Sequence, residues 1–198
     1  MYDKELIASK LRRWEAYMHR FKLPMWDEIP NFGLYMEQVI VLLKQYLDYL
    51  PEDINDRQQI ITSSMINNYV RTKIMPEPVK KKYFRVHLAY LIMICTLKQS
   101  MNFADLKNLI PTGVSEEEVK DFYESFATHH RNTTEFFVSQ TRLLAANILG
   151  HEKAGQYAVE SPTDLITVSA VISGFSGVLA NKLLLLEGKT LKDEETSE

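Results

Sequence analysis

The sequence is poor in the residues that several common kinds of site require. Its 198 residues include one cysteine, Cys95, which excludes an internal disulfide and a multi-thiolate metal centre. The seven glycines are scattered, so no glycine-rich phosphate loop is present. No charged leader with an apolar stretch and a small-residue cleavage site opens the chain. We therefore expect a cytosolic protein in a reducing setting.

Catalytic and metal-binding patterns are also missing. No two of the histidines lie four residues apart, the spacing that a zinc site on one helix uses; they are His19, His87, His129, His130 and His151. Cys95 lies in an apolar helical run, where burial favours a packing role over that of a nucleophile. No Glu-x-x-His repeat supports a di-metal cluster. We therefore expect no metal and no cofactor, and an enzyme is the least favoured class of function.

Charge is nearly balanced overall and uneven along the chain. The 23 lysines and arginines against 26 acids give a formal net charge of −3. Between Arg57 and His87, seven positive residues accompany one acid, Glu77, so this segment carries +6 and the remainder −9. A basic patch on an acidic protein indicates contact with a polyanion at one place. A solvated surface is the plainer alternative, because lysine runs occur on many surfaces.

Hydrophobic residues spaced three and four apart predict a mainly α-helical protein. Helix starts are marked by Thr62, by Asn102, by Ser115 with Glu118, and by Ser161 followed by Pro162. Trp26 is expected to pack its loop onto the core. We expect helices over residues 6–21, 34–50, 63–71, 84–100, 103–110, 116–149 and 162–188, the sixth of which breaks or continues near Asn132.

The last of these helices is apolar enough to raise the question of a membrane span. Residues 165–186 contain one charge, Lys182, and their number alone would permit a span. Several serines and threonines in the stretch, and a mean hydropathy of −0.21 for the whole chain, oppose that interpretation. We expect no membrane contact and a helix buried in the core or in a dimer interface.

Three stretches between residues 61 and 110 occur in the order of a known DNA-binding module. They are Tyr69-Val-Arg-Thr-Lys-Ile-Met-Pro76, then Tyr83 followed by Leu88 and Leu91, then Met101-Asn-Phe-Ala-Asp-Leu-Lys-Asn-Leu-Ile110. In this order they resemble the MerR family, in which a Tyr-containing recognition helix runs into a Gly-Leu-Leu-Pro-type turn, a wing ending in Tyr, and two further helices. Lys73 stands in place of that turn's glycine. Trp26 to Pro30 and Met65-Ile-Asn-Asn-Tyr-Val70 are also similar to a bacterial family of domains of unknown function that carries this motif.

The resemblance implies a surface that reads double-stranded DNA. If Met65, Ile66 and Tyr69 point inward, the candidates for contact with base edges are Ser63, Ser64, Asn67, Asn68 and Arg71. Asn pairs with adenine and Arg with guanine, each with about 1–3 kcal/mol of discrimination. The candidates for contact with phosphate are Tyr69, Lys73, Lys80, Lys81, Lys82, Tyr83 and Arg85, the three consecutive lysines lying where a wing would follow the backbone. The resemblance implies that Tyr69 and Tyr83 are either structural or in contact with phosphate.

The predicted architecture is a MerR-like winged helix-turn-helix with a minimal β-hairpin wing and a helical C-terminal part. Its segments are an N-terminal helix and Trp/Pro loop (1–33), the DNA-binding module (34–111), helices suited to dimerisation (112–188) and a flexible tail (189–198). Pro76 and Pro78 forbid a helix between the recognition helix and the next one. The predicted function is a DNA-binding transcriptional regulator of MerR-like type that acts as a homodimer through its C-terminal helices.

Two alternatives stay open. The first is a helical module for protein–protein interaction that has lost DNA binding. The second adds a small effector, not identified by the sequence, held by aromatic residues of the C-terminal part: Phe122, Tyr123, Phe126, Phe136 and Phe137. Such residues are more often plain core.

Overall fold

The computed structural model describes residues 4–50, 60–150 and 158–184. In these residues eight α-helices and one short 3₁₀ helix, η1 (Trp26–Glu28), account for all regular structure, so the mainly α prediction is confirmed. The helices are α1 (Lys4–Met18), α2 (Met36–Tyr46), α3 (Ser63–Arg71), α4 (Arg85–Leu97), α5 (Phe103–Leu109), α6 (Glu116–Leu144), α7 (Ala146–Leu149) and α8 (Pro162–Leu184).

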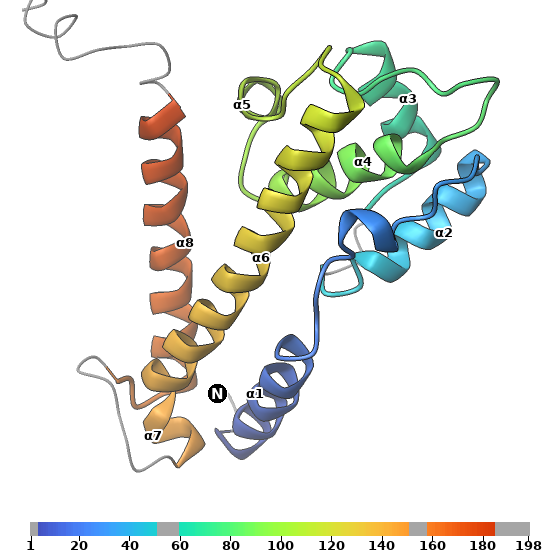
Figure 1. Ribbon diagram of the computed structural model, residues 1–198. Helices are drawn as coiled ribbons and strands as arrows, with labels where there is room; N and C mark the ends of the chain where they lie inside the picture. The colour runs from blue at the N-terminus through green and yellow to red at the C-terminus, as the bar shows by residue number, and fades with distance from the viewer. Residues whose placement is uncertain (1–3, 51–59, 151–157, 185–198) are drawn as a thin grey trace, which may run out of the picture.

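The long helix α6 joins the two ends of the molecule (Figure 1). Its 29 residues extend over roughly 43 Å at 1.5 Å per residue. Helices α2 to α5 gather around its first half, whereas α1, α7 and the start of α8 lie at its other end. Each end has its own buried apolar cluster.

Helix α4 forms the centre of the larger cluster. Every residue from His87 to Cys95 is buried, as expected for a helix that is apolar on all sides and surrounded by others. Trp26 is also buried here, 6.2 Å between ring centroids from Tyr123, which confirms its predicted packing role. The Tyr123 hydroxyl donates a hydrogen bond of 2.7 Å to the Pro24 carbonyl and so ties the N-terminal loop to α6.

The predicted helix starts are confirmed. Thr62 Oγ1 accepts a hydrogen bond from the Met65 amide, and Asn102 Oδ1 accepts from the amides of Ala104 and Asp105. Ser115 and Glu118 form the expected reciprocal capping box, and Ser161 Oγ accepts from the Asp164 amide. Each cap satisfies backbone donors that the first helical turn leaves without a partner.

Some helix boundaries differ from the prediction. Helix α1 ends at Met18 instead of residue 21, and α2 covers residues 36–46 instead of 34–50. The helix that begins after Ser115 passes Asn132 without a break and ends at Leu144, and the short α7 follows and closes at Gly150 with a φ of +72°. Asn132 lies on an exposed position, where an amide side chain does not disturb the helix.

The predicted β-hairpin wing needs correction. The described residues contain no strand, and Val79 pairs with Lys82 in an isolated bridge instead. Pro76 and Pro78 lack the amide hydrogens that a ladder would need on one side of the turn. On the other side, Tyr83 pairs with Leu34 in a second isolated bridge. In place of the predicted wing, the described residues form a tight turn that is anchored to the segment before α2.

Two expectations fall on residues outside the described ranges: the end of the last helix at Gly188 and the tail 189–198. No helix in the described part of the chain, α8 included, has the length and hydropathy needed to span a bilayer.

Candidate nucleic-acid interface

Helix α3 buries one side and exposes the other, as its sequence predicts. Ile66 and Tyr69 are buried and Met65 is half-buried, while Ser63 and Ser64 are exposed. Four of the five base-contact candidates line one open depression of about 830 Å³: Ser64, Asn67, Asn68 and Arg71, together with Thr62, Met65 and Tyr69. The fifth, Ser63, is exposed beside them. The helix therefore presents a continuous polar face.

Two of these candidates are already joined to each other. Arg71 Nη2 donates a hydrogen bond of 2.7 Å to Asn68 Oδ1. This contact holds the guanidinium along the exposed face, while Asn67, one residue before Asn68, is exposed. The pair reduces the side-chain entropy that Arg71 would lose on meeting a ligand.

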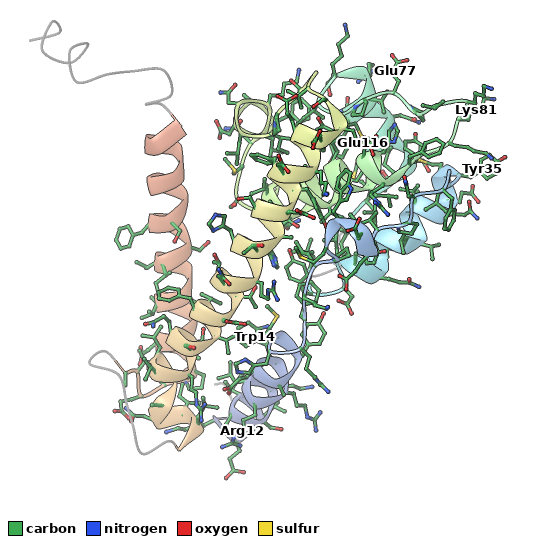
Figure 2. All side chains as sticks on the ribbon, in the orientation of Figure 1. Arg12, Trp14, Tyr35, Glu77, Lys81 and Glu116 are labelled. Carbon is green, nitrogen blue, oxygen red and sulfur yellow. The ribbon has the colours of Figure 1, made fainter. Side chains whose placement is uncertain are left out.

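Residues 79–82, here called the lysine turn, have an unusual backbone conformation. Lys80 and Lys81 have φ values of +50° and +64°, and the flanking Val79 and Lys82 exchange two hydrogen bonds of 3.0 Å between their amides and carbonyls. Positive φ at both central residues is the signature of a type I′ turn, whose preferred residues are Asn and Gly. Lys81 lies at the tip of this turn and points outward (Figure 2).

Lys73, the second residue after α3, has a φ of +59°. It occupies the left-handed position of a helix C-terminal cap, in which the amides of Lys73 and Ile74 donate to the carbonyls of Val70 and Tyr69. It is the position at which the MerR-like pattern has glycine, and the backbone keeps the left-handed conformation although the residue is lysine. A non-glycine residue in this region costs about 1–2 kcal/mol. Lys73, Lys80 and Lys81 are the only described residues other than glycine that have positive φ.

The turn is supported by Gly33 and Tyr35, two residues that the sequence patterns did not single out. Leu34 and Tyr83 exchange hydrogen bonds of 2.8 Å, which brings Gly33 against Lys82. A Cβ added at Gly33 would lie 2.9 Å from Lys82 Cβ, so only glycine fits. Lys82 Nζ lies 5.4 Å from the centroid of the Tyr35 ring, a cation–π contact.

Three phosphate-contact candidates are engaged by other parts of the fold, two of them in the core. Tyr69 and Tyr83 are buried, and Tyr69 stacks on Phe103 with ring centroids 6.3 Å apart. Burial raises the pKa of the Tyr69 hydroxyl to about 12. Arg85 Nε donates to the Ile29 carbonyl at 2.9 Å, and its Nη1 lies 3.2 Å from Asp27 Oδ1. These three side chains hold the module together.

His87 supplies one half of a capping box at the start of α4 by accepting from the amide of the capping residue, Phe84. The Phe84 amide donates to His87 Nδ1 at 3.0 Å, and His87 Nε2 lies 3.0 Å from the Glu77 carbonyl, to which it donates. The buried ring thus links the proline-containing segment to the start of α4. Its signal in the sequence is its position three residues after Phe84, where capping boxes place a side chain that accepts from the cap amide.

The exposed lysines have no acidic partner in the described ranges. No ion pair there involves Lys73, Lys80, Lys81, Lys82 or Arg71. Their charge is therefore not neutralised by a neighbouring carboxylate of residues 4–50, 60–150 or 158–184.

The described side chains give less support to a metal site, a nucleophilic cysteine or an effector pocket. Within the residues described, no three His, Cys, Asp or Glu side chains are grouped to hold a metal ion. Burial raises the pKa of the Cys95 thiol to about 11, which suits packing and not nucleophilic attack. Of the aromatic residues considered as an effector pocket, Tyr123 is buried in the core, whereas Phe136 and Phe137 are exposed.

Comparison with known families gives one match. A family model described as a domain of unknown function, DUF1836, matches residues 24–126, which is more than half of the chain. The chain belongs to the DUF1836 family. The matched range contains α2 to α5 and the first part of α6, and so includes the lysine turn and the polar face of α3. No curated protein and no solved structure matches the chain. The DUF1836 description assigns neither a helix-turn-helix nor a MerR likeness.

Proposed function

We propose that this DUF1836 protein binds double-stranded DNA through α3 and the lysine turn, and that it regulates transcription as a homodimer. The observation that carries the proposal is the left-handed conformation of Lys73, Lys80 and Lys81. Residues held in a sparsely populated backbone region cluster at functional sites, where the surrounding structure maintains them. Glycine would remove that strain and also remove the positive charge.

Electrostatics supports phosphate as the ligand of the turn. Lys80 and Lys81 are exposed on a projecting tip, and Lys82 is held over Tyr35 at the base of the same turn. Ammonium groups on such a tip contact backbone phosphates as point charges and carry little sequence information. We therefore assign Lys80, Lys81 and Lys82 to phosphate contact.

The polar face of α3 supports readout of base edges. Asn67 offers a free carboxamide for the paired donor and acceptor of adenine, and Arg71, positioned by Asn68, offers two parallel donors for guanine. Ser64 adds a short hydroxyl at the beginning of the helix, where recognition helices approach the groove. Ser63, the preceding residue in the same first turn, is also exposed.

The exposed apolar side of α8 supports pairing of two chains. Phe175 is 72% exposed, and Val171 and Ile172 are exposed on the same side of that helix. Two-fold DNA sites match two-fold proteins, so a dimer is the arrangement in which two α3 helices read two half-sites. Phe175→Asp should shift the mass measured by light scattering to that of a monomer. Ser173→Asp, an equal charge at an exposed polar position, should not.

A gel shift over a series of salt concentrations tests DNA binding. Affinity should fall steeply with salt, with a log–log slope of about −0.9 for each phosphate contact. Replacing Lys80, Lys81 and Lys82 with Ala should weaken binding to all sequences alike and reduce the slope by about three. Asn67→Ala should instead change which sequences are preferred.

Exposed cations at the other end of the molecule provide the matched control. Lys4 and Arg13 are exposed on α1, far from α3 (Figure 1). Their replacement with Ala should leave the salt slope unchanged. No binding at low salt, or an equal loss in the α1 control, would refute the assignment.

A specific observation favours a second candidate function, protein–protein interaction without DNA. Phe32 and Val41 are 64% and 59% exposed, and they border an apolar groove of about 450 Å³ with Pro30, Leu34, Leu42, Glu37, Gln38 and Gln45. Exposed apolar patches of this kind mark contact sites. If the gel shift is negative at low salt, this face of α2 becomes the leading candidate for function, and Val41→Asp should abolish binding to the partner.

A further inference from the structure

A second groove lies between α1 and the first turns of α8. Its lining consists of Ile7, Lys10, Leu11 and Trp14 on α1 and Pro162, Leu165, Ile166 and Ser169 on α8, around about 400 Å³. On each helix these positions follow the pattern i, i+3, i+4, i+7, so each helix turns one continuous stripe toward the groove. The groove lies at the opposite end of α6 from α3 (Figure 1) and outside residues 24–126.

The smaller core holds the walls of this groove in place. Leu165 is buried in that core, and Ile7 and Leu11 pack against it. Trp14 is fixed by Phe137 of α6, in an edge contact with ring centroids 6.1 Å apart. Apolar, preformed cavities of 300–1,000 Å³ with few polar groups are typical of sites for small molecules.

Charge limits the ligands that suit the groove. Lys10 is its single charged lining residue and is exposed, and no described carboxylate forms an ion pair with it. Ser169 adds one hydroxyl on the opposite wall. Helix α1 carries four cations, Lys4, Lys10, Arg12 and Arg13, against Glu5 and Glu15. A ligand with an apolar body and one anionic end matches this arrangement.

The volume of the groove favours a small ligand over a helix from a partner protein. Two turns of a helix with its side chains, about 10 Å long and 10–12 Å wide, occupy on the order of 800 Å³. The groove offers half of that. At about 30 Å³ for each water-sized group, it accommodates roughly a dozen heavy atoms, the size of a medium-length acyl chain with its carboxylate.

We propose that this groove binds a free, single-chain carboxylate amphiphile of about ten carbons. The chain lies along the two apolar stripes, beside Trp14 and Leu165, and the carboxylate meets Lys10 Nζ. This binding does not depend on the proposed DNA contacts, because none of its residues belongs to α3 or the lysine turn.

Titration of the full chain with decanoate, at concentrations at which decanoate is monomeric, tests the proposal. Trp14 lines the groove and Trp26 is buried in the other core, so a saturable change in tryptophan emission reports on occupancy against a constant background. From hexanoate upward, affinity should rise about threefold to fourfold for each methylene that is buried, and it should level off once the chain fills the groove. Decylamine should bind more weakly than decanoate.

Matched variants locate the site. Lys10→Gln should weaken decanoate binding at least about threefold, whereas Arg13→Gln, which removes an exposed charge outside the lining, should not. Ser169→Phe should fill the groove and abolish binding, whereas Ser173→Phe, one turn further along α8, should preserve it. Circular dichroism and the melting temperature establish that each variant is folded.

Four results would overturn the proposal. They are the absence of a saturable decanoate signal, equal affinity for decylamine, equal effects of Lys10→Gln and Arg13→Gln, and unchanged binding in Ser169→Phe. Association with phosphatidylglycerol vesicles without any binding of monomeric decanoate would also overturn it, because the occupant would then be a membrane surface.

Discussion

Two double substitutions in the lysine turn separate its backbone strain from its charge. Both remove the ammonium groups of Lys80 and Lys81. Changing the pair to Asn-Gly supplies the residues that a type I′ turn prefers, whereas changing it to Ala-Ala keeps two residues that resist positive φ. The two variants have the same net charge, so any difference in stability between them reports on the backbone.

The magnitude follows from the two φ values of +50° and +64°. A left-handed conformation costs an ordinary L-residue about 1–2 kcal/mol. Glycine avoids this cost but lowers the folding free energy gain by about 0.4–1 kcal/mol, because its unfolded chain has more conformational entropy to lose. The two sites together should make the Asn-Gly variant more stable than the Ala-Ala variant by about 1–2 kcal/mol. For a chain of this size, that corresponds to a rise in Tm of about 2–8 °C.

Thermal unfolding and fluorescence anisotropy with labelled duplex DNA measure the two effects on the same samples. Asn-Gly should melt above the natural protein and Ala-Ala close to it, while both should lose DNA affinity equally, with a salt slope lower by about two. Equal melting temperatures for the two variants would refute the strained turn. Undiminished DNA affinity in both would refute the assignment of these lysines to phosphate.

Three further predictions concern the rest of the structure. Gly33→Ala should lower the unfolding free energy by about 1–3 kcal/mol, because its Cβ would lie 2.9 Å from Lys82 Cβ. Tyr123→Phe should cost about 1–2 kcal/mol, since it leaves the Pro24 carbonyl without its buried donor. Burial lowers the pKa of His130, so the folded state binds a proton less readily than the unfolded state. The contribution of the neutral His130 side chain to folding stability is therefore fully present above the unfolded pKa of about 6.5. It is lost as the pH falls from there toward the folded pKa.

Each of these has a measurement and a control. Urea titrations give the two free energies, with Gly113→Ala as a comparison in open space that is strained only by its φ of +71°. An Ala at residue 33 that costs nothing would contradict the close approach, and full stability in Tyr123→Phe would contradict the buried hydrogen bond. For His130, the drop in Tm between pH 7.5 and 5.5 should shrink in His130→Phe. An unchanged drop would assign the pH dependence to other groups.

Features that depend on a few neighbouring residues were predictable from the sequence. The start of α3 at Thr62 and that of α5 at Asn102 follow from caps whose partners lie two or three residues away. The inward side of α3 follows from helical spacing alone. These signals act within one turn of helix, so no knowledge of the fold was required.

Features that depend on contacts between distant segments were not predictable. Arg85 was assigned to phosphate from its place in the basic segment, but residues 27 and 29 engage its guanidinium across more than fifty positions of the chain. Gly33 acquires its importance only because Tyr83 pairs with Leu34. The lysine turn and its flanking residues were predicted as a β-hairpin because the sequence does not show which of their backbone amides form hydrogen bonds with another segment.

The left-handed backbone of these lysines could not be predicted from the sequence. Turn signals rely on Gly, Asn and Asp, and Lys73, Lys80 and Lys81 hide three left-handed positions from such a search. Only a few per cent of non-glycine residues have positive φ, yet all three in the described chain are lysines within nine residues of one another. The repetition of the same charged side chain at these positions supports the proposed role of the charge in DNA binding. We predict that glycine in place of Lys80 and Lys81 gives a more stable protein that binds DNA more weakly.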